Sequence, residues 1–121
     1  MARRWRDKFA EAASGVRQAA AEQSSFRVHF AAAASVGALA AWLRCPAIEW
    51  CLLLGCVAAV FAAEIFNRAL EPLFLALDES TKARMRGCLD QAAGAVLVVS
   101  AGAAILGALI LGPRLLAVAG Y

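Results

Sequence analysis

Long runs of apolar residues constrain the fold of this chain more than any other feature. Residues 50–63 (WCLLLGCVAAVFAA) carry no charged side chain, and in residues 92–112 the only hydroxyl is Ser100. Over the whole chain 63% of the residues are hydrophobic and 17% are charged, whereas about 25% are charged in an ordinary soluble domain. Apolar runs of this length can cross a bilayer as helices. The sequence therefore predicts an all-α membrane protein.

Three transmembrane helices are predicted, at residues 28–43, 47–77 and 90–112. The first is short and rich in alanine, so it should pack against protein rather than face lipid on all sides. The second would be about 46 Å long as a helix, against about 30 Å for the hydrocarbon core, so part of it should project into water. Pro46 should separate the first two spans, and the polar stretch 78–87 should form a loop before the third. Pro113 and Arg114 should end the third span, unless the helix continues into the last residues.

An amphipathic helix is predicted before the spans, at residues 2–22. Its apolar residues recur every three or four positions, and basic residues occupy much of the remaining surface. Such a helix suits the surface of a bilayer with anionic headgroups; a solvated helix packed on the domain is the alternative. The segment has no apolar stretch of the length that a signal peptide requires. We expect one domain over residues 1–121.

The distribution of lysine and arginine predicts the orientation. Six of them precede the first span and three lie in the stretch 78–87, whereas Arg44 and Arg114 are the two expected on the other side. Because cytoplasmic segments carry the excess of positive charge, the amino terminus should be cytoplasmic. Nothing in the sequence resembles a nucleic-acid-binding module. The four cysteines show no CxxC spacing, which favours a packing role over a disulfide or a metal site.

Polar residues interrupt the second apolar segment in the stretch EIFNRALE. Glu64, Asn67, Glu71 and Asp78 are spaced so that one helical face would carry all four. In one interpretation Arg68 neutralises a glutamate and the asparagine joins two helices. In the other, the acids face a divalent cation, since carboxylates inside a membrane commonly face a partner, an ion or a wet pocket. Magnesium bound to phosphate oxygens is the usual cytoplasmic case, and a carboxylate that does not bind the metal could deprotonate a lipid hydroxyl.

The stretch EIFNRALE resembles the signature of the prokaryotic diacylglycerol kinase family, which includes undecaprenol kinases. The stretches FAEAASGVRQA, SSFRVHFAAA and LDQAAGAVLVVSA resemble further family motifs in the same order, so the resemblance covers nearly the whole chain. It implies a homotrimer of three-span protomers, each with a surface helix, in the bacterial cytoplasmic membrane. The active sites would be shared between protomers.

The resemblance also implies roles for individual residues. Glu64 corresponds to the general base, Asn67 to its support, Glu71 to a Mg²⁺ ligand and Asp90 to an acid of the ATP site. The sequence departs from the family pattern where a phosphate-binding lysine gives way to Leu89; Arg86 is the candidate to replace it. The metal-ligating acid of the first helix is Gln23 here, and Glu22 could serve only if the helix start shifts. Two further departures are Leu75 in place of an aspartate and Pro72 directly after the second glutamate.

These observations predict a Mg²⁺-dependent lipid kinase that transfers the γ-phosphate of ATP to diacylglycerol or undecaprenol at the cytoplasmic face. A weakened or inactive family member that binds lipid is the alternative, because a phosphate-binding cation is missing. A small proton-coupled transporter using Glu64 is a third hypothesis, which the three spans and the segment around Asp90 argue against.

Overall fold

The computed structural model describes residues 4–22 and 24–121, the side chains of residues 22, 24 and 25 excepted. These residues form four helices: α1 (Trp5–Glu22), α2 (Ser24–Trp42), α3 (Ala47–Leu75) and α4 (Glu79–Val118). The described residues contain no strand, so the predicted all-α class is confirmed.

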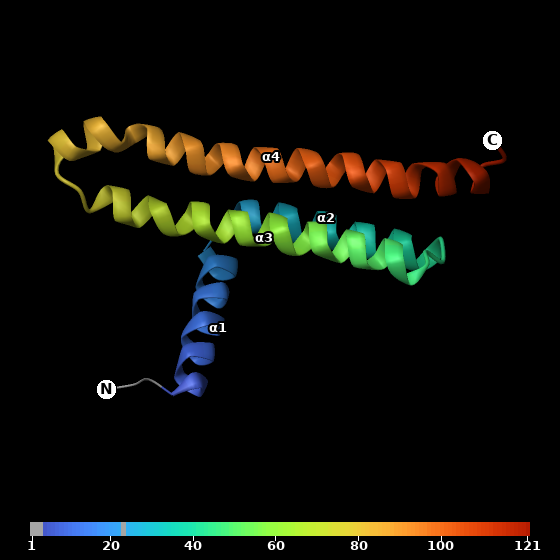
Figure 1. Ribbon diagram of the computed structural model, residues 1–121, viewed down its shortest axis with the longest axis horizontal. Coiled ribbons are helices and arrows are strands. Elements are labelled where there is room, and N and C mark those ends of the chain that lie inside the picture. The colour runs from blue at the N-terminus through green and yellow to red at the C-terminus, as the bar shows by residue number, and fades with distance from the viewer. Residues whose placement is uncertain (1–3, 23) are drawn as a thin grey trace.

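The long helices α3 and α4 run antiparallel, side by side, and make the most extensive helix contact (Figure 1). The shorter helix α2 lies along the part of α3 nearest its start. Helix α1 stands at a steep angle to these three, near the start of α2 (Figure 1). The arrangement is a small bundle from which one amphipathic helix projects.

Two helices, α3 and α4, are long and apolar enough to cross a membrane. The apolar part of α2, Phe26–Trp42, is shorter than an ordinary span. Length and composition thus account for two of the three expected spans, and α2 as the third stays a prediction.

The predicted loop at residues 78–87 is wrong, because α4 begins at Glu79. Asp78 caps this helix: its Oδ1 accepts a hydrogen bond from the Thr81 amide at 2.7 Å, as an N-cap aspartate does. The residues that follow are mostly good helix formers, and Gly87 is the only strong breaker among them. Since α3 ends at Leu75, Asp78 does not belong to the polar face of α3.

The turn between α2 and α3 lies where Pro46 predicted it. The Cys45 amide donates to the Ala40 carbonyl at 3.1 Å and the Arg44 amide to the Ala41 carbonyl at 3.2 Å, the pattern of a Schellman motif. This motif needs a left-handed residue, and Arg44 takes that conformation with φ 55°. Pro46 then stands at the N-cap of α3.

Pro113 does not end α4, which continues to Val118. A proline removes one backbone donor and crowds the preceding turn, but long apolar helices tolerate it where neighbouring groups satisfy the freed carbonyl. The alternative that the last residues extend the helix is therefore correct.

The buried core is small and lies at the turn end of the bundle. It consists of Ala40, Cys45, Leu53 and Leu111, with partly buried neighbours around them. Many large apolar side chains are exposed, among them Phe66, Leu97, Val98 and Leu109. A single copy in water would leave far more apolar surface uncovered than soluble monomers do, which agrees with a chain that lies in lipid.

Candidate active site

Glu64 is the only buried charged or polar residue among those the structure describes, with 3% of its surface exposed. It lies on α3, just after the apolar run of residues 50–63. A carboxylate removed from solvent is costly unless it is paired. Its surroundings therefore indicate what the site is built to hold.

Arg68 connects the two glutamates of α3. Its Nε lies 3.0 Å from Glu64 Oε1, and its Nη1 lies 3.7 Å from Glu71 Oε1. The spacings of four and three residues place all three side chains on one face of the helix. The structural interpretation, in which Arg68 neutralises a glutamate, is thus observed, and one guanidinium is shared between two acids.

Helix α2 adds His29 to this group. Its Nε2 lies 3.6 Å from Glu64 Oε2, which is too long for a direct hydrogen bond. The ring meets Phe61 edge-on, with centroids 6.4 Å apart, and Phe26 packs on the same Phe61 at 4.9 Å. His29 belongs to the stretch SSFRVHFAAA, but the sequence does not place it beside Glu64, since that contact depends on how α2 packs against α3.

The other predicted site residues occupy different positions. Asn67 is half-buried on the same helix as Glu64 and Glu71. Asp90 and Arg86 lie exposed on α4, and within the described chain no hydrogen bond or ion pair joins either of them to Glu64 or Arg68. The predicted role of Glu22 falls outside the described side chains.

The described residues do not form a protein-only metal site, since they contain no group of three or more His, Cys, Asp or Glu side chains that could hold a metal ion. The Glu71 side chain is 47% exposed. It contacts Arg68, which in turn binds Glu64. One or two carboxylates plus substrate phosphates and water suffice for magnesium. A metal at Glu71 would therefore need most of its ligands from outside the described residues.

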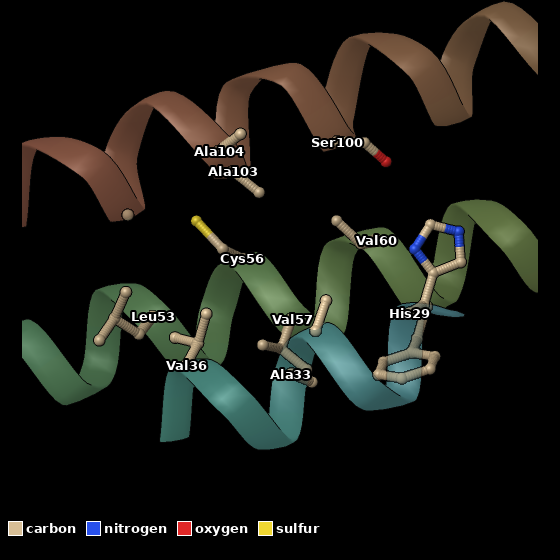
Figure 2. A pocket seen from close by; sticks show the side chains of 13 residues that line it. His29, Ala33, Val36, Leu53, Cys56, Val57, Val60, Ser100, Ala103 and Ala104 are labelled. Carbon is tan, nitrogen blue, oxygen red and sulfur yellow. The ribbon is translucent and has the colours of Figure 1, made fainter. Parts of the chain in front are cut away.

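A cavity of about 310 Å³ lies between α2, α3 and α4 and reaches His29 at one end (Figure 2). Small residues on α2 and α4 make room for it, namely Ala32, Ala33, Ala103, Ala104 and Gly107. Apolar side chains of α3 form most of the remaining wall, and the polar groups in its lining are His29 and Ser100, with the thiol of Cys56. The cavity thus leads from an apolar interior towards the buried carboxylate.

Together these features define a class of protein: an all-α chain with two long apolar helices and a buried carboxylate, paired with arginine, near an apolar cavity. Residues 10–111 match the family described as prokaryotic diacylglycerol kinase. The protein belongs to this family, and its general class is therefore that of the lipid kinases of prokaryotic membranes. No match was found among curated proteins or among solved structures.

Proposed function

We propose that the protein transfers the γ-phosphoryl group of ATP to the hydroxyl of a membrane lipid, diacylglycerol or undecaprenol, at the cytoplasmic face. The observation that carries the proposal is the buried Glu64, held by Arg68 beside a cavity of apolar walls. A base beside the histidine that lines one end of an apolar cavity suits an alcohol whose remainder is hydrocarbon. Membership of the kinase family supports the same reaction class.

The length of α3 supports a reaction at the membrane surface. From Ala47 to Glu64 the helix rises about 27 Å, close to the roughly 30 Å thickness of the hydrocarbon core. Glu64 would then lie at one edge of the core, and residues 65–75 of α3 would project into water with the facing start of α4. Helix α2 would be the third span, and α1, leaving the bundle near this level, would lie on the membrane surface (Figure 1).

In the proposed reaction, the lipid oxygen attacks the γ-phosphorus and forms a new P–O bond. The bond from this phosphorus to the bridging oxygen of ADP breaks, and ADP leaves. The hydroxyl proton passes to the carboxylate of Glu64, which acts as general base. Arg68 keeps Glu64 in place from one side, His29 bounds it on the α2 side, and Asn67 would support the base and the γ-phosphate.

The nucleotide would lie on the water-facing side of Glu64. Glu71 would hold Mg²⁺ there together with the phosphates, with Glu22 as a further candidate ligand. When bound, the metal neutralises charge on the phosphates. Asp90 and Arg86 are exposed on α4, where they are available to complete the site of a neighbouring protomer in a homotrimer. The exposed apolar side chains leave surface for such an assembly.

The alternative function, a lipid-binding protein with weak or no turnover, is favoured by one observation. Leu89, which replaces a phosphate-binding lysine of the family, is a half-buried apolar residue next to Asp90. The absence of one electrostatic donor lowers phosphoryl transfer by about 10²–10³-fold if it resembles loss of an oxyanion contact. Replacing Leu89 with lysine should then raise the rate.

The test measures ³²P transfer from ATP to diacylglycerol and to undecaprenol in mixed micelles. We expect Mg²⁺-dependent product with the wild type and loss of product in Glu64→Gln and in Glu71→Ala. Glu79→Gln is the matched control, because Glu79 is an exposed glutamate at the start of α4. No transfer to either lipid from a folded protein would reject the kinase in favour of the lipid-binding alternative.

A further inference from the structure

Ser100 has a hydroxyl oxygen that is buried and has no hydrogen-bond partner in the described part of the chain. A serine inside an apolar helix commonly satisfies itself by bonding the carbonyl four residues earlier. Ser35 does so on α2, donating to the Ala31 carbonyl at 2.8 Å. Ser100 does not, and a buried hydroxyl without a partner costs free energy. Its orientation therefore calls for an acceptor from outside the chain.

The Ser100 side chain points into the cavity between α2, α3 and α4 (Figure 2). Figure 2 shows its oxygen at the same end of the cavity as the His29 ring, which in turn lies beside Glu64. The opposite end is lined by Leu53, Val36 and small residues of α4. The cavity thus has a polar end near the buried carboxylate and an apolar remainder.

We propose that Ser100 donates a hydrogen bond to an ester carbonyl of the lipid alcohol and so selects an acylglycerol over a polyprenol. This inference rests on the proposed function, because the same cavity would bring the lipid hydroxyl to Glu64. An acylglycerol carries an ester carbonyl a few bonds from its free hydroxyl, so one molecule can meet both groups. A polyprenol has its hydroxyl as its only polar group, and it would leave Ser100 without an acceptor.

The size of the cavity agrees with this occupant. Its volume of about 310 Å³ is at the lower end of the range for small-molecule pockets, roughly 300–1,000 Å³. It can hold a glycerol ester and the first part of one chain. The rest of the lipid would leave through the open side of the cavity into the bilayer.

The experiment compares two substrates that differ only in the carbonyl groups: dioctanoylglycerol and its ether analogue dioctylglycerol. Initial rates of ³²P transfer are measured for both, and for undecaprenol, in wild type, Ser100→Thr and Ser100→Val. Threonine and valine have nearly the same shape, and only threonine keeps the hydroxyl. Ser35→Ala is the control for a membrane hydroxyl that is already bonded. Native mass spectrometry without ATP measures the occupancy of each glycerol in the same variants.

We expect Ser100→Val to lower the ester-to-ether rate ratio by roughly three- to tenfold, as the loss of one neutral hydrogen bond implies. Ser100→Thr and Ser35→Ala should keep the ratio, and transfer to undecaprenol should not fall in Ser100→Val. An equal ratio in the threonine and valine variants overturns the inference and leaves the kinase intact. If no lipid is phosphorylated, the occupancies decide: an ester preference that valine abolishes upholds the Ser100 contact while the proposed function fails. Equal occupancies reject both.

Discussion

The two ends of the apolar part of α3 each carry a glutamate paired with an arginine. The two pairs differ in burial and in the helices that they join. At one end Glu64 is buried and pairs with Arg68 on the same helix, four residues away. At the other end Glu49 Oε2 lies 2.8 Å from Arg114 Nη2 on α4, and these side chains are 21% and 35% exposed. The first pair does not connect helices, whereas the second ties the start of α3 to the end of α4.

The two pairs have different roles. The Glu64–Arg68 pair lies within one helix and does not itself join helices. Glu64 also lies beside His29 of α2, and the cavity between α2, α3 and α4 reaches this histidine. The Glu49–Arg114 pair closes the bundle beside the core cluster, which contains Cys45, and burial raises the pKa of that thiol. We therefore interpret the Glu64 end as the reactive end and the Glu49 end as a structural clamp.

The largest expected effect is on catalysis. Glu64→Gln should lower the rate of phosphoryl transfer by about 10²–10⁴-fold, the usual contribution of a general base. Glu49→Gln should leave the rate close to that of the wild type, because Glu49 lies at the opposite end of the apolar part of α3. Steady-state transfer of ³²P to lipid measures both. Equal losses in the two variants would remove the distinction between the ends.

The next effect is on stability. Arg68→Met should lower the free energy of unfolding by about 3–5 kcal/mol, because it removes the guanidinium that is hydrogen-bonded to the buried carboxylate of Glu64. The double variant Glu64→Gln/Arg68→Met should recover much of this loss. Unfolding of the micelle-bound protein by SDS, followed by circular dichroism, gives the values. The exposed Arg84 supplies the matched control Arg84→Met, and a single variant no less stable than this control would contradict the burial argument.

A smaller effect is expected for the clamp. A double-mutant cycle over Glu49→Gln and Arg114→Met should give a coupling energy of about 1 kcal/mol or less, as partly exposed pairs do. Because solvent reaches both side chains, added salt should weaken the coupling. A coupling as large as that of the Glu64–Arg68 pair, or one that salt does not change, would mean that both ends are buried alike.

The same contrast explains how much could be predicted from the sequence. The all-α class, the turn at Pro46 and the shared face of Glu64 and Glu71 follow from periodicity and local spacing, which a linear sequence displays. Contacts between helices do not: the place of His29 beside Glu64, the clamp from Glu49 to Arg114 and the cavity at Ser100 depend on packing register.

The segment after α3 was predicted wrongly for a different reason. Its high polarity favours a loop, but a polar segment outside the membrane also forms a helix when its first turn is capped. Asp78 supplies that cap to Thr81. The family roles of Asn67, Glu71, Asp90, Arg86 and Glu22 stay predictions.

The smallest expected effect is the dependence of this cap on pH. Hydrogen bonds from Thr81, and then from Ser80, hold the pKa of Asp78 below its usual value of 3.8. The unfolded chain therefore binds this proton more readily than the folded protein does, so the contribution to stability is present above 3.8 and is lost as the pH falls through the folded pKa. Asp78→Asn keeps an acceptor for Thr81 but cannot titrate. Thermal unfolding compared at about pH 6 and about pH 3 should show a larger loss in the wild type than in this variant. Equal losses would mean that the charge of Asp78 does not stabilise the start of α4, in contrast to the charge of Glu64 on α3.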